Sequence, residues 1–211
     1  MSSSIPTPAE RGRPRSFDPE TALQRATEVF WRHGFQGASL AELTAATGLS
    51  KPSLYAAFGD KEALYLRCLQ LYTERQVSRQ TELLEQEPDA RRAVESFMKA
   101  MAQGLTDPEA PGGCFVVNGS ADCGMQATPL SVDAALRDAA AGPEQRLLAR
   151  LKRAEREGQL PQGSDVKGLA TLFATVLAGM AVMAKASNPK KRLDDAARAA
   201  MAAWPVVRRV G

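Results

Sequence analysis

The run "GLSKPSLYAAFGDKEAL", residues 48–64, gathers hydroxyl, ammonium and phenol groups in one short segment. Ser50, Lys51, Pro52 and Ser53 would stand in the first turn of a helix, where small donors and one cation can meet base edges in the major groove of DNA. The free N–H groups at such a helix start also suit a phosphate oxygen. We therefore expect these four residues at a nucleic-acid interface.

Two more polar side chains flank this first turn. Tyr55 lies two residues beyond Ser53 on a different face, where its phenol can hydrogen-bond a phosphate. Lys61, at the start of the next helix, combines its charge with the positive end of a helix dipole, which again favours a phosphate. Leu54 and Phe58, four residues apart, would face inward and fix the helix on its scaffold.

The helices that must position these groups have strong start and stop signals. Asp18 is a suitable cap for a first helix, which "HGF" ends with Gly34 in a left-handed conformation. Ser39 and Glu42 have the S-x-x-E spacing of a capping box, which predicts a short second helix ending at Gly48.

Ser50 then caps another short helix that tolerates Pro52 in its first turn and runs to about Phe58. Asp60 caps a long helix that reaches about Leu84. Two short helices joined by a glycine-containing turn, with longer helices on either side, are typical of a helix-turn-helix.

Charge supports this interpretation only locally. The net charge is +3, and acidic and basic residues are equal in number between Glu10 and Glu62. Arg13 and Arg15 lie in "RGRPR", within residues 1–16, which we expect to be a flexible basic arm. Such an arm can bind DNA, by entering the adjacent minor groove or touching phosphates. The alternative is a solvated, disordered tail.

The rest of the chain repeats its apolar residues at helical spacing, so we predict an all-α fold. Gly142-Pro143 should kink or split one of the helices, and "CFVVN" is the one short β-like run. Further helices are predicted over residues 90–105, 130–157 and 166–186, with a last one ending near Trp204.

The run from "AERGRPRSF" through "HGFQGASLAELTAATGLSKPSLYAAFGDKEAL" to "YLRCL" resembles the N-terminal domain of TetR-family transcriptional regulators. The resemblance implies a three-helix DNA-binding domain at 17–62 and a ligand-binding, dimer-forming helical domain at 63–211. It also implies a homodimeric repressor that binds a palindromic operator and releases it when a small molecule binds. By the same resemblance the following residues fall on positions that contact DNA: Ser39, Ser50, Lys51, Ser53, Tyr55 and Lys61.

Helices beginning near Val166 and Leu193 match the place where such proteins build a four-helix dimer interface. The alternative is ordinary packing within one subunit. "GLATLFATVLAGMAVMA", residues 168–184, carries no charge and approaches the length of a membrane span, but a helix buried on both sides is favoured. We expect a cytoplasmic protein with no membrane partner. The predicted dimer-interface residues are Ala170, Ala174, Ala178, Gly179, Met201 and Trp204.

The segment "GGCFVVNGSADCG" resembles one found in a TetR subgroup that includes electrophile sensors, which makes Cys114 a candidate sensing thiol. A buried structural cysteine is the alternative. Cys123 would lie half a turn away if the segment were one helix, so no disulfide is expected. Asn118 and Asp122 could face a cavity, act as caps or face solvent. The candidate ligand-binding or sensing residues are Phe97, Met101, Cys114, Asn118, Cys123, Phe173 and Leu177.

Other classes of function find little support. With three cysteines lacking CxxC spacing and one histidine, the chain offers few metal ligands, and we expect no metal and no cofactor. No nucleophile-and-base set and no phosphate-cradling glycine loop is visible, so we expect no enzyme. Three hypotheses remain: a ligand-released DNA-binding repressor, a regulator gated by Cys114, and a helical small-molecule-binding or membrane-associated protein without DNA affinity.

Overall fold

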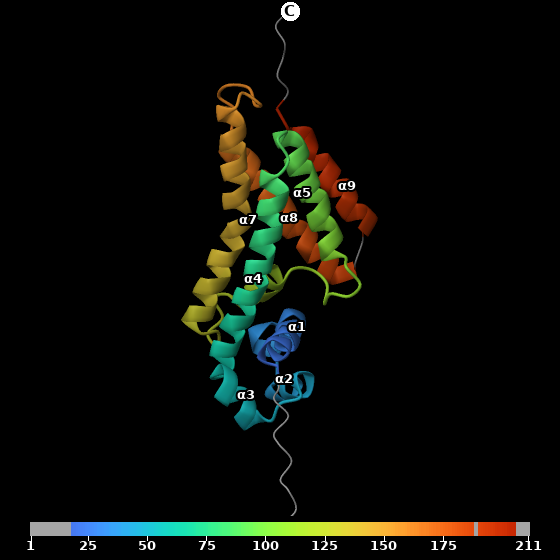
Figure 1. The fold of residues 1–211 in the computed structure, drawn as a ribbon. Helices are drawn as coiled ribbons and strands as arrows, with labels where there is room; N and C mark the ends of the chain where they lie inside the picture. Colours follow the sequence, from blue (N-terminus) through green and yellow to red (C-terminus); the bar gives the residue numbers. More distant parts are fainter. Residues whose placement is uncertain (1–17, 188–189, 206–211) are drawn as a thin grey trace, which may run out of the picture.

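A computed structural model describes residues 18–187 and 190–205, and within these ranges the chain forms helices and no strand. The predicted all-α class is therefore confirmed. Figure 1 shows α1, α2 and α3 at one end of the molecule, and a larger bundle of α4, α5, α7, α8 and α9 at the other. The helices are α1 Pro19–Gly37, α2 Leu40–Thr47, α3 Lys51–Phe58, α4 Lys61–Glu85, α5 Ala90–Leu105, α6 Phe115–Gly119, α7 Leu130–Arg156, α8 Val166–Ser187 and α9 Lys190–Ala200, with 3-10 turns η1 Ser120–Asp122 and η2 Met201–Ala203.

The caps predicted from the sequence form as expected. The Asp18 carboxylate accepts the N–H groups of Glu20 and Thr21 and starts α1. The capping box of α2 is complete, because Ser39 and Glu42 each accept an N–H from the other residue. Gly48 ends α2 with φ 70°, a left-handed conformation that costs glycine little.

Helix α1 is broken rather than ended at Gly34. This residue has φ 70° and ψ −176°, which interrupts the helical geometry, yet the helix resumes as far as Gly37. The sequence predicts the left-handed glycine but not the short segment after it. Since a lone turn has few internal hydrogen bonds, contacts from elsewhere must hold this segment in place.

The described residues form two hydrophobic cores, and the first core draws on residues beyond the predicted domain boundary at residue 62. The core that α1, α2 and α3 cover also contains residues of α4, α6 and α7. Residues of the predicted second domain, 63–211, therefore pack into the core of the first. These additional members are Leu64, Tyr65, Cys68, Leu69, Phe115, Val116, Val132 and Leu136. The end that carries α1, α2 and α3 is therefore packed directly against the segment that contains Cys114.

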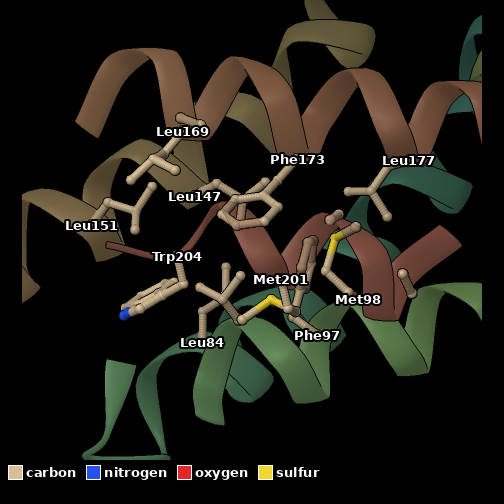
Figure 2. Close-up of a cluster of buried hydrophobic side chains, with 14 of the residues drawn as sticks. Leu84, Phe97, Met98, Leu147, Leu151, Leu169, Phe173, Leu177, Met201 and Trp204 are labelled. Carbon is tan, nitrogen blue, oxygen red and sulfur yellow. The ribbon is translucent and has the colours of Figure 1, made fainter. Parts of the chain in front are cut away.

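The second core lies between α4, α5, α7, α8 and α9, and Figure 2 shows its side chains pointing toward one another. Met201 and Trp204 are 6% and 8% exposed, and Ala170 is fully buried. These three residues already pack in the core of their own subunit, and their role at a dimer interface stays a prediction. Periodicity alone does not separate a buried face from an interface face.

The structure defines two local features that the sequence left open. The β-like run "CFVVN" forms the start of α6, where burial of Phe115 and Val116 favours the helix over the β propensity of its residues. Pro143 does not split its helix, because α7 is one element from Leu130 to Arg156. Leu136 and Leu147, on either side of the proline, are fully buried, and this packing compensates for the lost hydrogen bond.

Helix α8 buries one apolar stripe and exposes another. It is long and apolar enough to cross a membrane, with mean hydropathy 1.8, but only 33% of that window is buried inside the chain. Leu172 is 39% exposed and Val182 59% exposed. The expectation of a helix buried on both sides is therefore not met within one subunit.

Candidate nucleic-acid interface

Helix α3 packs one face against the rest of the chain and exposes its first turn. Leu54 is fully buried and Phe58 is 4% exposed, so both hold the helix on its scaffold as predicted. Lys51, Pro52 and Ser53 are all exposed in the first turn. Because the helix lies at the tip of the molecule (Figure 1), nothing in the described chain blocks its approach to a groove.

The start of α3 has hydroxyl groups that already bind each other. Ser50 Oγ accepts the N–H of Ser53 at 3.3 Å, and the two hydroxyl oxygens are 2.9 Å apart. This arrangement caps the helix and fixes both rotamers. It leaves two hydroxyl oxygens at fixed positions in the turn that would face base edges.

Tyr55 and Lys51 form one polar group on the side of α3. The Lys51 ammonium lies over the Tyr55 ring, 5.8 Å from its centroid, within the range of a cation–π contact. Tyr55 is half-buried, so its ring braces the lysine while part of it stays accessible. Tyr55 remains a candidate for a phosphate contact, and the exposed Lys51 can reach a phosphate as well as the base edges predicted for it.

Lys61 and Ser39 are less free than their sequence positions imply. The Lys61 ammonium lies 5.0 Å from the centroid of the Phe35 ring and is partly buried. Burial lowers the pKa of Lys61, while the carboxylates of Asp122 and Glu42 raise it. The hydroxyl of Ser39 donates to Glu42 at 2.7 Å. Lys61 as a phosphate ligand and Ser39 as a DNA contact stay predictions, as do the DNA contacts of Arg13 and Arg15, which lie outside the described residues.

We call the end of the molecule that carries α1, α2 and α3 the reading end. It contacts the segment around Cys114 and helix α8 in ways that the sequence does not predict. The Asn118 amide donates to the backbone oxygens of Trp31 and Gly112, both at 3.2 Å. Trp31 Nε1 also donates to Gly112 O at 3.1 Å. The Lys185 ammonium of α8 donates to Arg32 O at 2.9 Å. Helix α1 is thus held by the loop before α6, by α6 itself and by α8, through residues 81 to 153 positions away in the chain.

The three cysteines lie in different environments. Burial raises the pKa of Cys68 to about 12, and burial followed by the Asp133 carboxylate raises the pKa of Cys123. Cys114 is half-buried at the start of α6, and its sulfur accepts the Tyr72 hydroxyl at 3.3 Å. Burial, and secondly the nearby thiol, raises the pKa of Tyr72, so this phenol stays protonated and can donate.

The predicted ligand residues do not form one site. Phe97, Phe173 and Leu177 belong to the second core, with Met101 packed against it (Figure 2). The three remaining residues, Cys114, Asn118 and Cys123, lie in the junction near α1 instead. The candidates therefore lie in two separate regions and stay predictions, because sequence spacing does not show which core a helix faces.

The sequence does not predict two further groups of side chains, one beside α1 and one in the second core. A crevice of about 240 Å³ opens between α1, α4 and the loop before α6, and Trp31, Tyr72 and Pro111 line it. In the second region Arg146 donates to the buried amide oxygen of Gln80 at 2.8 Å, beside Met101. Neither set has a motif, so only the folded chain brings its members together.

A capped, exposed helix after a glycine turn, carried on a larger helical bundle, defines a DNA-binding regulator of the helix-turn-helix class. Comparisons with known proteins make this class specific. The model described as "Bacterial regulatory proteins, tetR family" matches residues 22–68, and "Tetracyclin repressor-like, C-terminal domain" matches residues 90–200. The chain is 33% identical over 198 residues to the HTH-type transcriptional repressor ComR of Escherichia coli K12, with 92% of each chain covered.

Solved structures agree with these matches. The TetR family transcriptional regulator CifR, as a cysteine mutant complexed with 26-bp double-strand operator DNA, has a TM-score of 0.85 and 39% identity, over 92% of this chain and 100% of that one. Reduced NemR of E. coli shares the fold, with a TM-score of 0.77 and 23% identity over 90% and 98% of the two chains. The chain belongs to the TetR family of bacterial transcriptional regulators.

Proposed function

We propose that the protein is a cytoplasmic homodimeric repressor that binds a palindromic operator through α3 of each subunit and leaves it when an effector binds. The observation that carries the proposal is the first turn of α3, where Ser50, Lys51, Pro52 and Ser53 are exposed above a helix anchored by buried residues. CifR, which is similar over 92% of this chain, was solved with operator DNA, and this supports the DNA partner.

Selection from random duplex DNA tests this proposal and does not require the operator sequence beforehand. The purified chain should enrich a palindrome whose half-sites lie about one helical turn apart or a multiple of it. A Lys51→Ala/Ser53→Ala double variant, folded as judged by circular dichroism, should not enrich the same sequence. Enrichment of no sequence by the native chain would contradict the proposal.

The dimer is supported by α8. Its exposed stripe contains Leu172, Ala178, Gly179 and Val182, and a Cβ built at Gly179 would meet no atom of the described chain within 4 Å. An apolar surface of this kind on a soluble regulator is best covered by a second copy, since a twofold axis pairs the stripe with itself. Of the six predicted interface residues, Ala178 and Gly179 lie on this exposed stripe, and all six stay predictions.

A second mode of release is favoured by one contact. The Tyr72 hydroxyl at 3.3 Å from Cys114 Sγ places a proton donor beside a half-buried thiol, and Tyr72 also lines the crevice that opens to solvent. Burial disfavours the thiolates of Cys68 and Cys123. We therefore propose Cys114 as the residue that a small electrophile would modify.

Alkylation with N-ethylmaleimide tests Cys114 directly. Peptide mass spectrometry should show modification of Cys114 before Cys68, and the modified protein should bind its selected DNA more weakly. A Cys114→Ser protein should keep its DNA affinity under the same treatment. If Cys114→Ser still releases DNA on alkylation, Cys114 is not the switch.

A further inference from the structure

The carboxylate of Asp122 links two segments that are far apart in the sequence. It belongs to η1, in the segment that follows Cys114, yet its Oδ2 accepts the N–H of Phe35 at 2.8 Å and that of Gln36 at 3.3 Å. Asp122 and Phe35 are 87 positions apart in the chain. Charge-assisted hydrogen bonds to backbone N–H groups are among the stronger ones in proteins.

The two N–H groups lie immediately after the break in α1. Gly34 interrupts the helix with φ 70°, so the amides of the next residues lack the carbonyl partners that a continuous helix would give them. Asp122 supplies the missing acceptor, as an N-cap residue does at an ordinary helix start. The carboxylate thus caps the last segment of α1 from outside the helix.

The fit at this point is close. A Cβ at Gly34 would lie 2.6 Å from Asp122 Oδ2, so the backbone admits the carboxylate only because residue 34 is glycine. A second link runs alongside, because Gln36 Nε2 donates to Thr128 Oγ1 at 3.2 Å and that hydroxyl donates to Asp122 O at 2.8 Å. Asp122 is therefore fixed on its own side as well as on that of α1.

The capped segment leads directly into the reading helices. Residues 35–37 end α1, Ala38 is fully buried, and Ser39 caps α2. Only the short turn at Gly48 separates α2 from the start of α3. A change in the direction of residues 35–37 would therefore change the orientation of both helices.

We propose that Asp122 is a positioning residue for DNA binding, and that its contact with the break in α1 transmits changes in the Cys114-containing segment to the reading helices. The proposal rests on the DNA-binding function proposed above. It uses the one carboxylate of η1, for which the sequence allows a cavity-facing, a capping or a solvent-facing role.

A purely electrostatic role and a positioning role of Asp122 predict opposite changes in DNA affinity for the same variant. Asp122→Asn removes a negative charge near an end of the molecule that would bind DNA, so charge alone would tighten binding. Loss of the charged acceptor would instead weaken it. Asp122→Ala should weaken affinity for the selected duplex by about tenfold or more, and Asp122→Asn, which keeps one acceptor oxygen, by less. The salt dependence should not change, because no phosphate contact is lost.

Asp133→Asn is the matched control. Asp133 carries the same charge, accepts from Gly124 N–H and Arg137, and has no hydrogen bond to α1 within the described part of the chain. It should bind DNA as the native chain does, or slightly more tightly. Hydrogen exchange should be faster at the Phe35 and Gln36 amides in Asp122→Ala and unchanged there in Asp133→Asn.

The two proposals fail in distinguishable ways. If the native chain selects no duplex, the DNA-binding function fails, whatever the exchange data show. If the native chain binds DNA and the folded Asp122→Asn and Asp122→Ala proteins bind it equally well or better, the positioning role is overturned. Unchanged exchange at Phe35 and Gln36 in Asp122→Ala would also overturn it.

Discussion

The hydroxyl oxygens of Ser50 and Ser53 lie 2.9 Å apart at the start of α3, and Ser50 Oγ also accepts the Ser53 N–H. The two residues therefore have unequal roles, although both are exposed. Ser50 caps the helix and its hydroxyl fixes the side chain of Ser53, whereas Ser53 does not cap the helix.

Replacing Ser50 separates capping from contact with DNA. Ser50→Ala should destabilise the chain by about 1 kcal/mol in urea unfolding, whereas Ser53→Ala should cost clearly less. Ser50→Asp should restore the stability, because aspartate is an equally good cap, but not the affinity for DNA, because it adds a negative charge facing phosphates. Full DNA affinity in a Ser50→Asp protein would show that Ser50 lies away from the duplex.

Lys51 should contribute to DNA binding mainly through charge. Because its ammonium is exposed and braced over Tyr55, Lys51→Ala should weaken binding to all duplexes alike and reduce the slope of log affinity against log salt by about one. Lys191→Ala is a suitable control, since Lys191 pairs with Asp195 on α9, away from the reading end. A loss confined to one sequence would instead assign Lys51 to a base contact.

Gly34 and Gly48 share φ 70° but differ in ψ, which is −176° at Gly34 and 13° at Gly48, and in what surrounds them. A Cβ at Gly48 meets nothing within 4 Å in the described chain, so Gly48→Ala should cost only the strain of the left-handed conformation, about 1 kcal/mol. Gly34→Ala puts alanine in a backbone region that essentially glycine alone adopts and also displaces the Asp122 carboxylate, so it should cost about 3 kcal/mol. Urea unfolding of Gly34→Ala in the native chain and in an Asp122→Ala background isolates the contribution of Asp122, and equal losses in the two backgrounds would mean that displacing this carboxylate costs nothing.

The sequence predicts those features that depend on near neighbours. Caps at Asp18, Ser39 and Ser50 form because each side chain reaches an N–H two or three residues away, within the window that a motif covers. The reading helix follows from such local rules together with the family resemblance. Its exposure on the folded chain then agrees with the prediction.

Features that the sequence does not predict depend on contacts between distant segments. No local pattern pairs Asp122 with Phe35 or Trp31 with Gly112. Likewise, a helical stripe looks the same whether it faces its own core or a partner. Periodicity therefore does not show that Met201 packs in the core of its own subunit or that Val182 is exposed.

Acid should weaken the α2 capping box. Hydrogen bonds from the Ser39 hydroxyl and then the Ser39 N–H lower the pKa of Glu42 below its ordinary value of 4.5, and nearby His33 and Lys61 act in the same direction. A lowered folded-state pKa means stabilisation that is present above the unfolded-state value and lost as pH falls through the folded-state value. Glu42→Gln should therefore be less stable than the native chain at about pH 7, and the gap should close toward about pH 3. A gap that stayed constant would contradict this assignment.

Val182 offers the sharpest test of the dimer. It is 59% exposed on the apolar stripe of α8, so Val182→Glu would place two carboxylates, one from each copy, in the proposed twofold interface, where burial of an unpaired charge is costly. Val77→Glu introduces the same change at an exposed valine of α4, 41% exposed, outside that stripe. Sedimentation equilibrium should show a monomer for Val182→Glu and a dimer for Val77→Glu, both with native helical content. Since two linked half-sites bind with higher avidity than one, Val182→Glu should also lose affinity for a palindrome more than for a single half-site. A dimeric Val182→Glu protein would place the interface elsewhere.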